Sequence, residues 1–107
     1  MSMQDRIMKE LKWLVESKNC EFLTEFSYSN CGKIYITKGF SNILNIHCDF
    51  QHNYCKFQVY DGENEPIATC GFTHEKCILN KTIDYHRLNE VKELLDYIKR
   101  KLNEKTK

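Results

Sequence analysis

Two short segments of the chain repeat an arrangement of cysteine, phenylalanine and histidine. Residues 48–55 read Cys-Asp-Phe-Gln-His-Asn-Tyr-Cys and residues 70–77 read Cys-Gly-Phe-Thr-His-Glu-Lys-Cys, so both fit C-x-F-x-H-x-x-C. Thiolate and imidazole are common ligands of Zn²⁺, and a tetrahedral site closed by two of each is structural. The repeat therefore raises the hypothesis of one zinc ion bound by His52, Cys55, Cys70 and His74.

Buried thiols without metal are the favoured interpretation of the same cysteines. The spacings inside the repeat are not those of the paired-cysteine knuckles in most zinc sites. Alternation in the sequence also points Cys48 and Cys55 toward a core, where free cysteine is common. The first eighteen residues lack the apolar stretch of a signal peptide, so we expect a cytoplasmic, reducing compartment with free thiols. No cofactor is predicted, with structural zinc as the alternative.

Catalysis finds little support in the sequence. The motifs of phosphate loops, dinucleotide sites, zinc proteases and serine hydrolases are all missing. A cysteine nucleophile needs a nearby base and an activating environment, and the six Cys and four His residues show no local signature of one. The sequence therefore favours a protein without enzymatic activity. A cysteine-dependent enzyme is the open alternative, and it requires one thiol far more reactive than the others.

Apolar residues at helical spacing mark the two ends of the chain. Met3–Lys18 and Asp84–Asn103 both carry apolar residues three or four positions apart, which places them on one helical face. Ser2 is expected to cap the first helix, and Asp84 the second. Each end is therefore predicted to form an amphipathic helix.

Between Cys20 and Ile83 the apolar period shifts to about two residues, which indicates strands. The last two predicted strands are Pro66–Phe72 and Cys77–Ile83. Short turns join the strands, so the sequence predicts an antiparallel meander of five to six strands. The expected fold is one α+β domain over residues 1–107, with the N-terminal helix and the long C-terminal helix on a single face of the sheet.

The other face of the predicted sheet is polar and rich in tyrosine, and it is expected to be open. Tyrosine among mixed polar neighbours is typical of protein interfaces. A formal net charge of +1 argues against a strongly basic nucleic-acid coat and an acidic DNA mimic. No apolar run exceeds three residues, so no membrane span is expected. The residues predicted to bind a partner are Lys33, Tyr35, Asn45, His47, Tyr54, Lys56, Gln58 and Tyr60.

These observations predict a small intracellular module that binds another protein. Lys, Asn and Ile are frequent while Ala and Pro are rare, which indicates a bias toward A/T-rich codons. This bias suits a phage or other mobile element. An inhibitor or accessory protein of a host enzyme is therefore expected. The alternative is a zinc-stabilised module that binds single-stranded nucleic acid. A homodimer through the C-terminal helix is a further prediction, because the stripe of Leu95, Ile98 and Leu102 extends beyond what a small sheet would cover.

Overall fold

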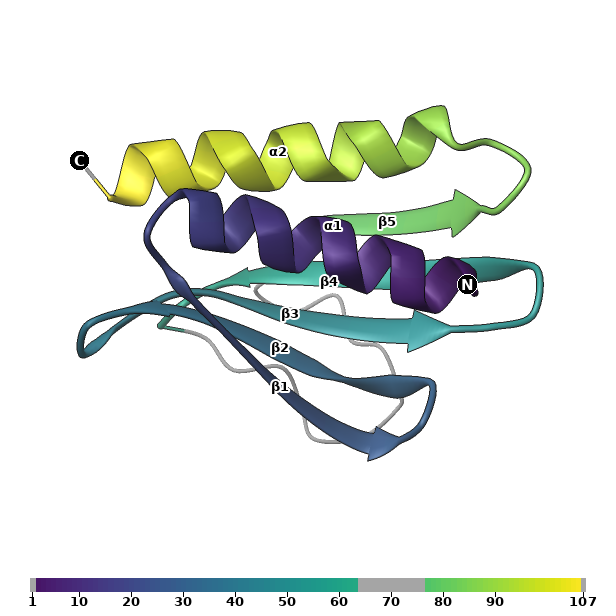
Figure 1. Ribbon diagram of the computed structural model, residues 1–107, viewed down its shortest axis with the longest axis horizontal. Helices are drawn as coiled ribbons and strands as arrows, with labels where there is room; N and C mark the ends of the chain where they lie inside the picture. Colours follow the sequence, from purple (N-terminus) through teal and green to yellow (C-terminus); the bar gives the residue numbers. More distant parts are fainter. Residues whose placement is uncertain (1, 64–76, 107) are drawn as a thin grey trace.

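A computed structural model describes residues 2–63 and 77–106 of the chain. Within them two helices flank five strands in sequence order (Figure 1). The elements are α1 (Met3–Ser17), β1 (Glu21–Tyr28), β2 (Cys31–Lys38), β3 (Ser41–Phe50), β4 (Tyr54–Asp61), β5 (Cys77–Asp84) and α2 (Asn89–Lys105).

The strands form one antiparallel sheet in the order β1-β2-β3-β4-β5. Each strand pairs with the next along the chain, which is a meander. Both helices lie on the same side of this sheet and run side by side in the same direction (Figure 1). The predicted α+β fold is therefore confirmed.

The core lies between the helices and one face of the sheet. Alternate residues of the central strands point toward the helices, as a pleated strand with a two-residue period requires. Each helix buries a single stripe of apolar residues. Neither helix within residues 2–63 and 77–106 is long and apolar enough to cross a membrane. The buried residues of the helices are Ile7, Leu11, Leu14 and Val15 on α1 and Val91, Leu94, Ile98 and Leu102 on α2.

The start of the second helix differs from the prediction. Residues up to Asp84 belong to β5, and α2 begins only at Asn89. The Asp84 carboxylate accepts a hydrogen bond from the backbone N–H of His86, 2.9 Å away, and so stabilises a turn instead of a helix start. The first helix is as predicted, because the Ser2 hydroxyl accepts a hydrogen bond from the backbone N–H of Asp5 at 3.1 Å.

The strand paired with β4 is Cys77–Asp84, which was predicted as a short sixth strand. The predicted strand Pro66–Phe72 lies outside the described residues. Polar contacts hold α2 over this edge of the sheet, and among them is the hydrogen bond from the Asp84 N–H to the Glu90 carboxylate at 3.3 Å. Others are the Lys81–Glu93 ion pair at 2.6 Å, the Lys105–Asp61 ion pair at 2.8 Å and the hydrogen bond from the Tyr97 hydroxyl to the Ile78 carbonyl at 3.2 Å.

Candidate functional site

The predicted partner-binding residues gather on the face of the sheet opposite α1 and α2, called here the far face. Strand register decides this, because residues opposite each other on neighbouring strands share a face. The register aligns Lys33, His47 and Gln58 in one row across β2, β3 and β4, and Tyr35, Asn45 and Tyr60 in the next. Lys56 and Tyr54 follow on the same side of β4 by alternation. The prediction that these residues share one face is confirmed.

The far face is not the open surface that the sequence suggested. At its centre Asn45 and Gln58 are 0 % exposed, and His47 and Tyr60 are almost as deeply buried. Of the predicted partner-binding residues, Tyr54 alone is classed as exposed, at 39 %, and Lys33, Tyr35 and Lys56 are half-buried. Alternation tells which way a side chain points, but it carries no information about whether that side is covered. The expected solvent exposure of the four central residues is therefore corrected.

These buried polar side chains form a hydrogen-bond cluster. The Tyr60 hydroxyl donates to Gln58 Oε1 at 3.1 Å, and Asn45 Nδ2 donates to the Gly62 carbonyl at 3.5 Å. Gln58 Nε2 is buried, and no group within residues 2–63 and 77–106 hydrogen-bonds to it. A buried donor without a partner costs about 1–3 kcal/mol.

His47 is the ionisable member of the cluster. Its Nε2 lies 3.9 Å from the Cys31 sulfur. Burial lowers the pKa of His47 from its ordinary value, and the positive charge of Lys33 lowers it further, while Asp49 opposes both. The geometry therefore favours a neutral imidazole inside the sheet layer.

The structure describes only half of the predicted zinc site. Cys70 and His74 lie outside the described residues. Cys55 is buried on the helix side, faces Ile83 across β4 and β5, and hydrogen-bonds to the Tyr85 side chain, whereas His52 is exposed in the turn before β4. The described parts of the chain contain no cluster of three or more residues suited to hold a metal ion. The zinc site and the nucleic-acid alternative linked to it stay predictions.

The free cysteines that the structure describes are in settings that weaken a nucleophile. Cys31 takes part in a disulfide, which differs from the expectation of free thiols throughout. Burial raises the pKa of Cys48 and of Cys55 to about 12, and it also raises the pKa of Cys20 and Cys77. Because the thiolate is the reactive form, these thiols are poorly suited to nucleophilic attack at neutral pH.

No family can be assigned from known proteins. No protein-family model, curated protein or solved structure matches the chain. A proposal therefore rests on the sequence, the side chains and their geometry.

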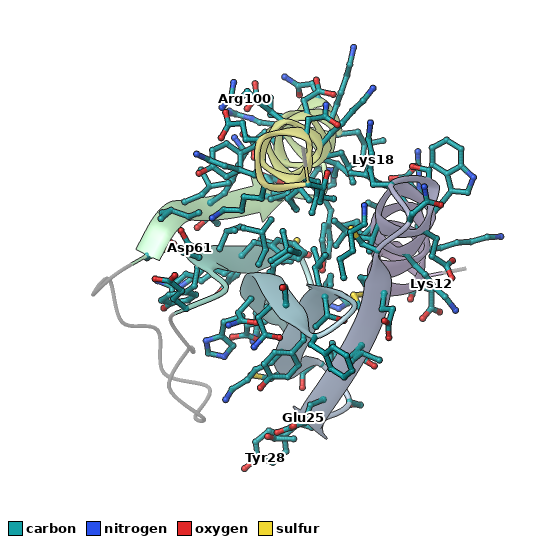
Figure 2. All side chains as sticks on the ribbon, turned by 90° about the vertical axis from the view of Figure 1, so that its left-hand side faces the viewer. Lys12, Lys18, Glu25, Tyr28, Asp61 and Arg100 are labelled. Carbon is teal, nitrogen blue, oxygen red and sulfur yellow. The ribbon has the colours of Figure 1, made fainter. Side chains whose placement is uncertain are left out.

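The outer side of the helix layer contains a groove that the sequence did not reveal. Figure 2 looks along the two helices, which lie together above the sheet. One end of the groove is a cavity of about 260 Å³ and the other a cavity of about 460 Å³, and both are lined by Glu10 and Leu95. We call this feature the interhelical groove and define it by Met3, Glu10 and Trp13 on α1, by Leu88 directly before α2, and by Leu95 and Lys99 on α2.

Trp13 is the prominent side chain of the interhelical groove. It lines the larger cavity together with Leu14 and Leu95, yet it is 71 % exposed. At the other end Leu88 is exposed as well. One sequence signal could have found this site: Trp13 stands off the buried stripe of α1, so its large apolar surface has no place in the core. Its position relative to α2 could not be read from the sequence.

Proposed function

We propose that this chain is a non-catalytic module that binds another protein through its interhelical groove, and that the occupant is an amphipathic helix of the partner. The observation that carries the proposal is the exposed Trp13 beside an apolar groove. The more specific role suggested by the composition, an inhibitor or accessory protein encoded by a phage or other mobile element, is part of the same proposal.

Trp13 has the properties of an interface anchor. Tryptophan is enriched among the few residues that supply most of the binding energy in protein interfaces. Leaving its large apolar surface in water is unfavourable by about 25 cal/mol per Å², so covering it stabilises a complex. Next to Trp13, the half-buried Leu95 and the almost fully buried Leu14 offer apolar contacts at the base of the groove.

A helix fits this groove better than an extended strand does. The wall from Met3 to Trp13 is about 15 Å long, which matches nearly three turns of a helix. Its two sides are helices and present no free backbone N–H or C=O groups to pair with a strand. An amphipathic helix instead needs only a furrow for apolar residues at spacings of three and four.

The interhelical groove is a better docking surface than the far face. Tight interfaces depend on large side chains that are accessible before binding, and His47, Asn45 and Gln58 are not. Tyr54 is exposed but is the first residue of β4, away from the buried centre of the far face. We therefore assign the partner to the helix side of the molecule.

The test is a display library of helical peptides with randomised surfaces, selected against the folded protein. The selected peptides are then measured against Trp13→Ala, a substitution at an exposed position that leaves the core intact. Loss of a central tryptophan anchor is expected to weaken binding about 30-fold or more.

Phe40→Ala is the matched control, because Phe40 is an exposed aromatic residue, more exposed than Trp13, in the turn between β2 and β3 and outside the groove. Binding that depends on Trp13 but not on Phe40 supports the proposal. A library that yields no binders, or binders indifferent to Trp13, overturns it.

A further inference from the structure

We infer that the helix bound in the interhelical groove carries acidic side chains along both edges of its apolar stripe. This inference rests on the proposed function and adds the chemistry of the partner. The charges that line the groove carry the argument. Four of its lining residues are basic, namely Arg6, Lys9, Lys92 and Lys99, and two are acidic, namely Glu10 and Asp96.

Internal pairing leaves most of the positive charge available to a partner. Arg6 and Glu10 lie 3.9 Å apart on α1 and offset one another. Among residues 2–63 and 77–106, the remaining three lysines take part in no ion pair, and they are exposed. Three exposed ammonium groups against the single carboxylate of Asp96 make the groove rim net positive. An acidic partner segment is the electrostatic complement of such a rim.

The spacing of the lysines on α2 adds a positional requirement. Lys92 and Lys99 are seven residues apart, so their backbones are about 10.5 Å apart along the helix axis. Leu95 lies between them on the same wall of the groove. A partner helix lying along this wall meets both lysines with acidic residues at positions i and i+7, on the flank of its apolar stripe. Lys9 stands on the opposite wall, so the other flank is acidic too.

The same charges disfavour a second copy of this chain as the occupant. In a two-fold dimer the same patch meets itself, so two net-positive rims would face each other. The apolar stripe that motivated the predicted homodimer is also largely covered, because Ile98 and Leu102 are 0 % exposed and only Leu95 reaches the groove. An acidic amphipathic helix satisfies the rim and the apolar floor together.

Three synthetic helical peptides of about 18 residues test the inference. All three peptides share one apolar stripe without tryptophan. They differ at positions i and i+7 on both edges of the stripe, which are Glu in the first peptide, Gln in the second and Lys in the third. The chain contains a single tryptophan, so the blue shift of Trp13 emission reports on the groove itself. At low salt we expect the Glu peptide to bind about tenfold more tightly than the Lys peptide, and this ratio should shrink as salt screens the charges.

Charge reversal on one wall locates the effect. In Lys92→Glu/Lys99→Glu the preference should invert, so that the Lys peptide binds more tightly than the Glu peptide. Lys12→Glu is the matched control, because Lys12 lies on α1 outside the groove and points away from α2 in Figure 2. The control should keep the preference of the unsubstituted protein.

The outcomes separate the two proposals. Equal binding of all three peptides, with an emission shift from Trp13, overturns the acidic partner and leaves the groove as a protein-binding site. No emission shift with any peptide counts against both. If the Trp13 emission shifts with increasing protein concentration in the absence of peptide, and sedimentation shows a dimer, the groove binds a second copy of this chain. That result also overturns the acidic partner.

Discussion

The two sides of the sheet are both buried at their centres, but they are built from different chemistry. Toward the helices, β3 and β4 present Ile46, Cys48 and Phe57, which are 0 % exposed. On the far face the same two strands present Asn45 and Gln58, which are equally inaccessible. Successive residues of one strand therefore alternate between an apolar layer on the helix side and a polar layer on the far face.

The difference shows what each layer requires. An apolar layer is stabilised in proportion to the area that it removes from water, and many combinations of side chains satisfy it. A buried polar layer depends on individual hydrogen bonds, and each donor without a partner is costly. Within residues 2–63 and 77–106, no group hydrogen-bonds to the buried Gln58 Nε2, so this part of the structure does not fully meet the second requirement. The helix side should therefore dominate the stability of the sheet.

The largest effect is expected on the helix side, from Phe57→Ala. Phe57 is fully buried and its ring packs edge-on against Phe50, with the centroids 5.5 Å apart. Removing a buried aromatic side chain usually lowers the free energy of unfolding by about 3–5 kcal/mol. Urea unfolding measures the change, and Phe40→Ala at a fully exposed site should stay within about 0.5 kcal/mol of the parent. A loss below about 1 kcal/mol for Phe57→Ala would contradict the dominance of this layer.

A much smaller effect is expected on the far face, from Gln58→Met. The substitution removes the Gln58 oxygen that accepts from the Tyr60 hydroxyl, and it also removes the buried Nε2, which has no partner among the described residues. Because the two consequences oppose each other, the free energy of unfolding should change by less than about 1 kcal/mol. The same urea titration decides the matter. A loss of more than about 2 kcal/mol would mean that the Gln58 amide is satisfied and that the far face is as demanding as the core.

At His47 the expected effect is small at neutral pH and grows in mild acid. Burial lowers the pKa of His47 below its ordinary value of 6.5, so the unfolded state binds a proton more readily than the folded state. The free energy of unfolding should therefore fall as the pH drops from about 7.5 through 6.5, and level off below the folded-state pKa. This range lies above the titration of ordinary carboxylates.

His47→Gln should flatten the slope of stability against pH over this interval. Only the slope is compared, because the substitution also changes the cluster at every pH. A slope that persists unchanged in His47→Gln would show that the imidazole is not held neutral by the fold. The far face would then be more hydrated than its burial indicates.

Local periodicity accounts for the part of the fold that was predictable. A two-residue period assigned Asn45, Gln58 and their neighbours to the side opposite the helices, and the register confirms that assignment. The spacing of the apolar residues predicted α1, and the serine directly before it predicted the cap. Both predictions depend only on residues close together in the sequence. Helical spacing placed the start of α2 too early, because Asp84 stabilises a turn as readily as a helix start.

The candidate sites depended on longer-range relations. Trp13 became a groove residue only because α2, far away in the sequence, packs beside α1. Likewise, whether His47 meets water is decided by what else packs on its side of the sheet.

The sequence by itself determined the direction of each side chain, because direction follows from the pitch of a strand or a helix. Only the tertiary structure decided which of those directions end in solvent, in a core or in a groove between two helices, because burial depends on segments that the local pattern does not bring together.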